Sequence, residues 1–566
     1  MKTRLKSFSC LLLCLLLASN LAAKTLGTPA ITTTTQAIAS AHPLATKAGM
    51  QILQQGGNAF DAAITVSAVL AVVEPYSSGI GGGGFWLLHS AGDQQDVMLD
   101  GRETAPGKAT ADMYLDKQGN VIKNLSITGA LAAGIPGEPA ALDWLAKHRG
   151  KLPLSKTLKP AIELAKKGFA VDAYYQQMLT FRLADIQASA EAANTFLIDH
   201  DIPAIGTLIK QPALAHTLQQ LATHGRAGFY QGEIAEKLVD GVQRAGGIWQ
   251  LDDLKNYRVK LRKPVVSHYK DMTITSAALP SSGGIVLAEM FNMLSAYPLE
   301  TLSKSTRTHL IIEAMRRAYR DRAEYMGDSD FVNVDLKRLT SPDYAAGLRQ
   351  SMRMDRATPS STLAPTFRDN SNGTDTTHFS IIDKAGNRVA ATLSINYPFG
   401  SCFMPAGTGI LLNDEMDDFS AKPGTPNVYG LVGAKANAIA PGKRMLSSMS
   451  PTFLETKDRL AIIGTPGGSR IITMVLLGSL AFHEGKSAEA IVNLPRYHHQ
   501  YLPDHIQYEP HALDSDTLKA LEKMGHHTQP HESSWGNMQI VIKDKRSGMT
   551  SAASDKRGIG KAITRP

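Results

Sequence analysis

Cysteine is nearly absent from this chain. The 566 residues contain 3 cysteines, and Cys10 and Cys14 both lie in the first 23 residues, which look like a removable leader. Without that segment Cys402 has no partner, so no internal disulfide can form and the fold must be held by its apolar core. Nothing singles out Cys402 as a nucleophile, and we expect a partly buried structural thiol there.

Aromatic residues and blocks of like charge are also scarce. Aromatics make up 6% of the chain, and the formal net charge of +8 is small for this length. Basic residues do not cluster with aromatics, which excludes the usual kind of nucleic-acid-binding surface. A hydrophobic content of 43% and 48 glycines favour a soluble α/β architecture in which backbones approach closely.

The chain has no long apolar run beyond its N-terminus. A basic stretch (residues 1–6) and a short apolar stretch (residues 10–18) precede NLAAK, which offers cleavage after Ala22 or Ala23. The apolar stretch is too short for an ordinary membrane span, although an uncleaved anchor is the alternative. We therefore expect residues 1–23 to be a signal peptide, and the mature protein to be exported, periplasmic or secreted, without a membrane span.

Several catalytic and ligand-binding motifs are missing. There is no G-x-S-x-G elbow and no H-E-x-x-H pattern, and the glycines of GIGGGGFW precede a strand rather than the helix that a phosphate loop needs. The His-rich stretch RYHHQYLPDH (496–505) lacks metal-ligand spacing, so we expect surface or hydrogen-bonded histidines and no metal. NDEMDDF (413–419) lacks the alternation of a calcium loop. It is either a solvated turn or an anionic pocket for a substrate ammonium group.

Hydrophobic periodicity predicts both helices and strands. Residues 42–75 predict two helices broken at Gly56 and Gly57, residues 135–260 are mainly helical, and two further helices are expected within 279–326. Residues 352–375 are polar and aperiodic, which is typical of an exposed loop.

A hairpin follows that loop. TTHFSIIDKAGNRVAATLSIN (376–396) predicts two strands around a tight turn, with either Ser394 or Asn396 opposite Thr376. A threonine hydroxyl needs an adjacent base to act as a nucleophile, and a cut before Thr376 would free an α-amine for that task. Simple cross-strand packing of a Thr-Thr pair is the alternative interpretation.

Motifs on both sides of the hairpin occur in a recognisable order. GIGGGGFWLL, DGRETAP and LPSSGG precede it, and GTGILLNDEMDDFSAKPGTPNVYGLVG, LSSMSPT and GTPGGSRI follow it. Together they resemble the γ-glutamyltransferase (γ-glutamyltranspeptidase) family over essentially the whole mature chain. The resemblance implies an α+β fold, the four-layer αββα sandwich of N-terminal-nucleophile hydrolases. It also implies self-cleavage between Asp375 and Thr376, which gives a large subunit (24–375) and a small subunit (376–566) that form one intertwined catalytic heterodimer.

The resemblance also implies roles for residues spread along the chain. Thr376 would be the nucleophile, with Ser394 beside it and with Gly467 and Gly468 supplying oxyanion-hole N–H groups. The α-carboxylate of the γ-glutamyl group would contact Arg102, Ser447 and Ser448, and its α-ammonium would contact Asn396, Glu415 and Asp418. Tyr429 would belong to a lid loop, with Asn396 as its partner.

The implied reaction cleaves glutathione and related γ-glutamyl compounds through a γ-glutamyl-Thr376 ester. The acyl group then passes to water, an amino acid or a dipeptide, and no cofactor is expected. One alternative is an acylase of the same fold for glutaryl-cephalosporin-like substrates, although Glu415 and Asp418 would then lack a substrate ammonium. A second alternative, from another class, is an uncleaved periplasmic solute-binding protein.

Overall fold

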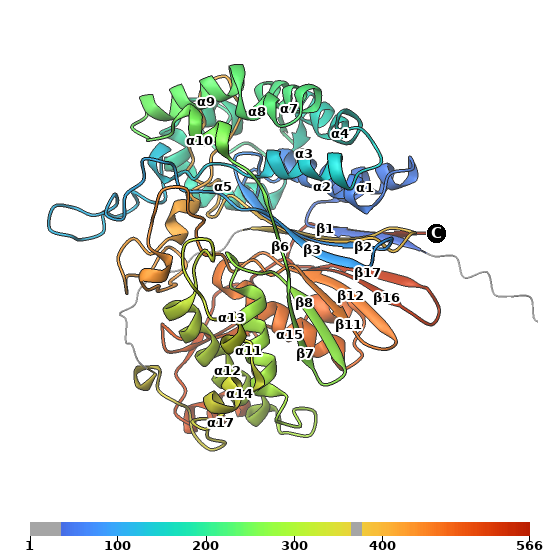
Figure 1. The fold of residues 1–566 in the computed structure, drawn as a ribbon, viewed down its shortest axis with the longest axis vertical. Helices are drawn as coiled ribbons and strands as arrows, with labels where there is room; N and C mark the ends of the chain where they lie inside the picture. Colours follow the sequence, from blue (N-terminus) through green and yellow to red (C-terminus); the bar gives the residue numbers. More distant parts are fainter. Residues whose placement is uncertain (1–34, 364–375) are drawn as a thin grey trace, which may run out of the picture. The chain divides into compact units, whose positions relative to one another are not determined.

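Two β-sheets lie between two layers of helices (Figure 1). The computed structural model describes residues 35–363 and 376–566, and the chain from residue 34 onward forms one compact unit. The αββα layering is the arrangement expected from the family resemblance. The leader and residues 364–375, which include Asp375, lie outside the described residues, so the signal peptide, the cut and the subunit boundaries stay predictions.

The first sheet contains the hairpin around Thr376. Its order is β18 (Lys561–Arg565), β1 (Gln36–Ser40), β9 (Thr377–Ile382), β10 (Arg388–Ser394), β2 (Gly83–Ser90), β3 (Gln95–Gly101) and β6 (Lys260–Arg262). In the antiparallel β9–β10 pair, Thr377 lies opposite Leu393. Extending this register by one residue sets Thr376 opposite Ser394, which decides between the two partners that the sequence left open.

The second sheet packs face to face on the first. Its order is β17 (Thr550–Ser554), β16 (Gln539–Asp544), β12 (Arg459–Gly464), β11 (Thr452–Glu455), β8 (Met272–Ser276) and β7 (Val265–Tyr269). Leu87 and Ile382 of the first sheet share one buried cluster with Phe453 and Ile462 of the second. These large apolar residues form the core between the two sheets, as aligned sheet packing requires.

Helices cover the outer face of the first sheet. They are α1 (Pro43–Gln54), α2 (Ala59–Val73), α3 (Glu138–His148), α4 (Leu154–Lys167), α5 (Ala173–Gln187), α6 (Ala190–Phe196), α7 (Pro212–His224), α8 (Ala227–Tyr230), α9 (Gly232–Arg244) and α10 (Leu251–Asn256). The predicted break after Gly56 and Gly57 is confirmed. Asn58 and Asp61 form a capping box that starts α2. Every residue of α2 is buried, because α2 contacts β9 and β10 as well as α1 and α4.

The other helical layer covers the second sheet. It comprises α11 (Gly283–Leu294), α12 (Lys304–Tyr325), α13 (Leu336–Leu339), α14 (Pro342–Arg349), α15 (Ile471–His483), α16 (Ala488–Val492) and α17 (Ser515–Lys523). Two small sheets complete the fold: β4 (Phe169–Ala170) with β5 (Leu208–Ile209), and β13 (Tyr497–His498), β14 (Ile506–Tyr508) and β15 (Thr528–Pro530). Within residues 35–363 and 376–566, no helix combines the length and apolar character needed to cross a bilayer.

The glycine run before β2 supports the end of β10. A Cβ atom added to Gly81 would lie 2.1 Å from the carbonyl oxygen of Leu411, and one added to Gly82 would lie 2.2 Å from that of Ser394. The backbone therefore crosses another segment closely at these glycines, where a side chain would not fit. They lie behind Ser394 and do not line the cavity that contains Thr376. Cys402 is fully buried, and burial raises the pKa of its thiol, which suits a structural role.

Candidate active site

One small cavity brings together residues that the sequence scatters over more than 360 positions. Its lining consists of Arg102, Thr376, Ser394, Asn396, Glu415, Asp418, Tyr429, Leu431, Ser447, Ser448, Met449, Gly468 and Ile471. Of the predicted site residues that are described, Gly467 alone is missing from this lining. The cavity lies where β3 and β10 end and β9 begins, which the antiparallel pairing places at one edge of the first sheet.

Thr376 and Thr377 have different surroundings. Thr376 is 5% exposed and lines the cavity, whereas the Thr377 hydroxyl donates a 2.8 Å hydrogen bond to Oε2 of Glu74 at the end of α2. Successive side chains on a strand point to opposite faces, so Thr377 is tied to the helical layer. Burial raises the pKa of Glu74 to about 8, although the hydrogen bond from Thr377 opposes this change. Thr376 is therefore the threonine of the pair that faces the cavity.

A buried cation between two carboxylates dominates the electrostatics of the cavity. Arg102 donates from Nη1 to Oε2 of Glu415 and from Nη2 to Oδ2 of Asp418, each at 2.5 Å. Burial opposes the charge of Arg102, but the adjacent Glu415 and Asp418 raise its pKa above the ordinary value. Burial also raises the pKa of Glu415. One guanidinium and two carboxyl groups are complementary to the carboxylate and the ammonium of an α-amino acid.

The serines and Asn396 hold the polar wall of the cavity in place. The Ser394 hydroxyl accepts a 2.8 Å hydrogen bond from the Asn396 N–H, and Ser448 Oγ accepts a 3.1 Å bond from Nη2 of Arg322. The Ser447 carbonyl accepts from the Ser282 hydroxyl at 2.8 Å. These bonds fix groups that come from distant segments of the chain, and so pre-organise the site.

The described lining of the cavity offers no histidine or lysine as a base. Among the described residues that line it, the carboxyl groups are Glu415 and Asp418, and each uses one oxygen to pair with Arg102. A threonine hydroxyl requires a base to become a nucleophile. A free α-amine on Thr376 itself would meet this need, as expected from the sequence.

Two glycines after β12 expose backbone donors. Gly467 has φ of 139° and Gly468 has φ of 55°, conformations that favour glycine. Neither of their N–H groups donates a hydrogen bond to a described residue. Gly468 lines the cavity of Thr376, and Gly467 lines a second cavity next to it. Two free N–H groups at the start of α15 are a geometry suited to a developing oxyanion.

The Tyr429 side chain closes over this glycine pair. Its hydroxyl donates a 2.6 Å hydrogen bond to the backbone carbonyl of Asn396, the partner expected from the sequence. A Cβ atom added to Gly468 would lie 2.4 Å from Cδ1 of Tyr429. The ring therefore packs directly on the Gly468 backbone, and the loop that carries Tyr429 covers the cavity.

The His-rich stretch holds Tyr429 from behind. Gln500 Nε2 donates to the Tyr429 carbonyl at 3.2 Å, and Gln500 Oε1 lies 2.8 Å from Nε2 of His498. Because the carbonyl only accepts, His498 must carry its proton on Nε2, which leaves Nδ1 as an acceptor 2.9 Å from the Thr473 hydroxyl. His498 and His499 are both buried. The prediction of surface or hydrogen-bonded histidines is thus confirmed by its second alternative, because both rings are hydrogen-bonded inside the protein.

Removing the Gln500 amide should loosen the loop over the cavity. In Gln500→Ala the Tyr429 carbonyl loses its donor, and a hydrogen bond contributes about 0.5–1.5 kcal/mol. We expect amide exchange around Tyr429 to become roughly two- to tenfold faster, as measured by hydrogen–deuterium exchange with mass spectrometry. Gln219→Ala, at an exposed position of α7, is the control. Unchanged exchange in Gln500→Ala would show that the contact does not hold the loop.

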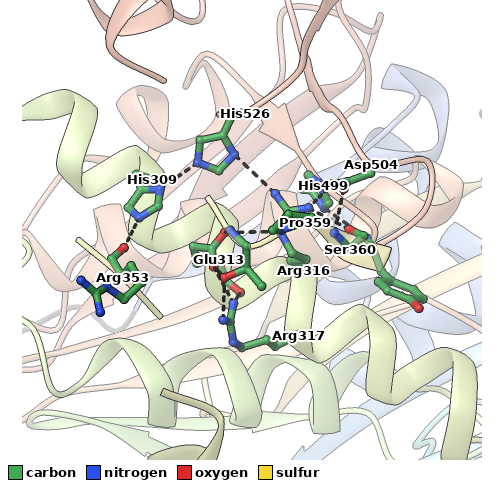
Figure 2. Close-up of polar contacts among 12 residues, drawn as sticks. His309, Glu313, Arg316, Arg317, Arg353, Pro359, Ser360, His499, Asp504 and His526 are labelled. Atoms are coloured by element: carbon green, nitrogen blue, oxygen red, sulfur yellow. Dashed lines mark hydrogen bonds and ion pairs between the residues drawn. The ribbon is translucent and has the colours of Figure 1, made fainter. Parts of the chain in front are cut away.

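His309, Glu313 and His526, outside the cavity, are close enough together to hold a metal ion (Figure 2). Their hydrogen bonds, however, already use the lone pairs that a metal would need. His309 Nε2 lies 2.6 Å from the Arg353 carbonyl, so it carries the proton, and His309 Nδ1 accepts from Nε2 of His526 at 2.8 Å. His526 Nδ1 then accepts from Arg316 at 3.4 Å. His526 Nε2 therefore has no lone pair to offer, and Glu313 is paired with Arg316 and Arg317.

This network instead fastens the chain shortly before residues 364–375. Glu313 accepts from the Thr358 N–H at 3.0 Å, and Asp504 Oδ2 accepts from the Ser360 N–H at 2.7 Å. Arg316 joins the two sides, since it donates to Ser360 Oγ at 2.7 Å and pairs with Asp504 (Figure 2). The network therefore ties residues 358–360 to α12 and to the His-rich stretch.

Sequence reasoning missed several residues that shape the site. Glu103 is buried beside Arg102, and burial and the neighbouring Glu415 raise its pKa. Arg322 on α12 holds Ser448, and Gln500 holds Tyr429. Glu103 could have been predicted as a site residue, because it directly follows Arg102 in the motif DGRETAP. The other two contacts join segments far apart in the chain and left no local signal.

The comparison with known proteins identifies the family. A family model described as Gamma-glutamyltranspeptidase matches residues 45–564. The chain belongs to the γ-glutamyltranspeptidase family. It is therefore an enzyme of this kind, as its sequence predicts, and the alternative of a solute-binding protein is excluded.

Relatives of the family match over most of their length. The glutathione hydrolase proenzyme of Pseudomonas sp. (strain A14) is 43% identical over 494 residues, which cover 86% of this chain and 85% of that protein. The glutathione hydrolase proenzyme of Escherichia coli (strain K12) is 39% identical over 529 residues, which cover 92% and 90%.

Solved structures confirm the fold class. Cephalosporin acylase from Bacillus halodurans aligns with a TM-score of 0.83 at 27% identity, over 94% of this chain and 96% of that chain. The γ-glutamyltranspeptidase of Helicobacter pylori aligns with a TM-score of 0.57 at 42% identity, over 58% of this chain and 94% of that chain. The second value reflects a solved chain that spans a little over half of this sequence.

Proposed function

We propose that this chain is an exported γ-glutamyltransferase/hydrolase that cuts itself between Asp375 and Thr376 and then uses Thr376 as its nucleophile. The donors are glutathione and related γ-glutamyl compounds. One observation carries the proposal: Thr376 shares a small cavity with a buried guanidinium flanked by two carboxyl groups, and the described residues that line it include neither histidine nor lysine. The names of the glutathione hydrolase proenzymes among the relatives support both the donor and the processing.

Maturation supplies the missing base. Addition of water across the bond between residues 375 and 376 leaves a carboxylate on Asp375 and an α-amine on Thr376. That amine lies next to its own hydroxyl and takes its proton during attack. Residues 24–375 and 376–566 become two subunits of one heterodimer, in which β9 of the small subunit lies between β1 and β10.

The catalytic step begins with the donor held at its amino-acid end. Arg102, Ser447 and Ser448 take the α-carboxylate, while Asn396, Glu415 and Asp418 take the α-ammonium. The Thr376 oxygen then attacks the γ-carbonyl carbon, and the N–H groups of Gly467 and Gly468 receive the oxyanion, at about 3 kcal/mol per donor. The amine leaves with the proton from Thr376, with Ser394 beside the reacting hydroxyl, and a γ-glutamyl ester remains.

Donor entry requires the Tyr429 loop to open. The cavity measures about 20 Å³, which is close to the space of a single water and far too small for a glutamyl group. Arg102 occupies the charged end through its pairs with Glu415 and Asp418. The donor headgroup replaces these pairs, so its ammonium and carboxylate find partners that are already desolvated.

An acylase of the same fold is the second candidate. It is favoured by the fold match to a cephalosporin acylase and by the Acylase ACY 1 proenzyme of Pseudomonas sp. (strain V22), which is 35% identical over 526 residues. A glutaryl group has no α-ammonium, so Glu415 and Asp418 would keep Arg102 and find no partner in the substrate. Their burial beside Arg102 therefore supports a γ-glutamyl donor.

A direct assay separates the two candidates. The purified mature protein is expected to release glutamate from glutathione and to hydrolyse γ-glutamyl-p-nitroanilide at least tenfold faster than glutaryl-p-nitroanilide, because only the first supplies the ammonium. Release of p-nitroaniline at 410 nm measures both rates. A preference for the glutaryl donor would establish the acylase, and no release from either donor would refute both.

A further inference from the structure

We propose that the second cavity, beside Gly467, is the subsite for the apolar, preferably aromatic, side chain of the acceptor amino acid. This inference rests on the proposed function, because an acceptor exists only if a γ-glutamyl ester forms on Thr376. The cavity measures about 120 Å³, compared with about 20 Å³ for the cavity of Thr376. Its lining is Tyr174, Gln177, Met178, Phe181, Pro466, Gly467, His531, Ser533, Ser534, Trp535, Gly536, Asn537, Arg557 and Gly558.

The position of the cavity connects it to the reacting carbon. Gly467 forms part of its wall, and the next residue, Gly468, lines the cavity of Thr376. In the proposed mechanism the N–H groups of these two glycines hold the carbonyl oxygen of the ester. An acceptor whose amine attacks that carbonyl therefore has its remaining atoms close to the same loop.

The lining is mixed, and its apolar part can hold an apolar side chain. Tyr174, Phe181 and Trp535 contribute aromatic surface, and Met178 contributes a flexible thioether. The charge of Arg557 is balanced by Glu509 at 2.6 Å and by Asp555 at 3.1 Å. Aromatic surface without an unpaired lining cation favours a ring or a branched aliphatic group over a charged one.

The volume of the cavity fits one such side chain. An engineered apolar cavity of about 150 Å³ in another protein binds benzene, so a cavity of about 120 Å³ suits a phenyl ring or a leucine side chain. The back wall is firmly packed, since Tyr174 makes an edge-to-face contact with Tyr76 at 5.3 Å and Trp535 is 4% exposed. Ligand contacts can therefore form without repacking of the core.

Phe181 on α5 gives the inference a clean test. This side chain is 62% exposed although it is large and apolar, so it contributes little to the core. Its role at the cavity is to cover the bound acceptor side chain. Because this side chain is exposed, replacing it should leave folding, self-cleavage and donor binding unchanged.

The transfer step itself is ordinary acyl exchange. The acceptor amine forms a bond to the γ-carbonyl carbon of the ester, and the bond from that carbon to the Thr376 oxygen breaks. The amine proton passes through the α-amine of Thr376 to the departing oxygen. The product is a γ-glutamyl amide of the acceptor, and the cavity changes only how well that acceptor is bound.

The experiment compares phenylalanine and glycine as acceptors with γ-glutamyl-p-nitroanilide as the donor. In Phe181→Ala we expect kcat/KM for phenylalanine to fall about five- to tenfold, as is usual when a side-chain contact in an apolar pocket is lost. The value for glycine and the rate of hydrolysis without acceptor should stay within about twofold. Ser534→Trp, which fills the cavity from its exposed rim, should lower transfer to phenylalanine in the same selective way.

The control and the contrary results are distinct. Phe331→Ala removes another exposed phenylalanine, 47% exposed and absent from the cavity lining, and should change neither acceptor. An unchanged phenylalanine-to-glycine ratio in both test variants would overturn the inference, and so would an equal loss for both acceptors. Failure of the wild-type protein to hydrolyse the donor would instead refute the proposed function, so the two failures cannot be confused.

Discussion

Replacing Thr376 with alanine is expected to leave the chain uncut and without turnover. The variant lacks the only hydroxyl that would become adjacent to a new α-amine, and the described cavity residues offer no histidine or lysine in its place. Loss of the nucleophile in a serine protease lowers kcat by about 10⁶-fold, and we expect a loss of several orders of magnitude here. Denaturing gel electrophoresis measures the cleavage, and release of p-nitroaniline measures the turnover.

Two conservative variants separate chemistry from folding. Thr376→Ser keeps the hydroxyl and should retain both self-cleavage and measurable activity. Thr377→Ser keeps the hydrogen bond to Glu74 and should behave like the wild type, because Thr377 belongs to the other face of β9. Cleavage of Thr376→Ala into the same two fragments would show that Thr376 is not the residue that performs the cut.

Replacing Asp418 with asparagine is expected to weaken binding of the γ-glutamyl donor strongly, while self-cleavage stays intact. Asparagine has nearly the same size and can still accept from Arg102, but it no longer offers a negative charge to the substrate ammonium. A hydrogen bond between charged groups contributes about 1.5–3 kcal/mol, which corresponds to a loss of about 10- to 150-fold in kcat/KM. Because the ammonium is bound before and during the reaction, most of the loss should appear in KM.

The substrate itself provides the control for this variant. Glutaryl-p-nitroanilide lacks the ammonium, so Asp418→Asn should change its kcat/KM by less than about threefold, and the two donors with the two proteins form a double-mutant cycle. An equal loss of kcat/KM for both donors would mean that Asp418 does not contact the ammonium, and instead positions Arg102 or stabilises the fold. Equal kinetics of variant and wild type with the γ-glutamyl donor would refute the role of Asp418 altogether.

Much of the fold was predictable because its signals are local. The capping residues at Asn58 and Asp61 follow the glycine pair that separates α1 from α2, and the turn at residues 385–387 separates two runs of strand-forming residues. The register of β9 and β10 was not predictable, since a hairpin turn tolerates more than one pairing. Contacts with β1 and β2 on either side are what set Thr376 opposite Ser394.

The composition of the site was also predictable, but only through the resemblance between ordered motifs. Periodicity alone could not place Arg102 beside Glu415, because these residues are 313 positions apart. No local pattern indicates that the His-rich stretch is buried. His498 and His499 are inside because their ring nitrogens meet Gln500 and Asp504, contacts that exist only after the chain has folded. The cavity beside Gly467 was missed for the same reason, since α5, the glycine loop and residues 531–537 are remote in sequence.

The proposed mechanism requires Thr376 to become an N-terminal nucleophile. N-terminal sequencing of the smaller fragment of the purified mature protein shows whether it does. We expect two fragments on a denaturing gel, the smaller of which begins Thr-Thr-His-Phe, from Thr376 onward. A single uncut chain that nevertheless turns over γ-glutamyl donors, or a smaller fragment that begins at any other residue, would contradict it.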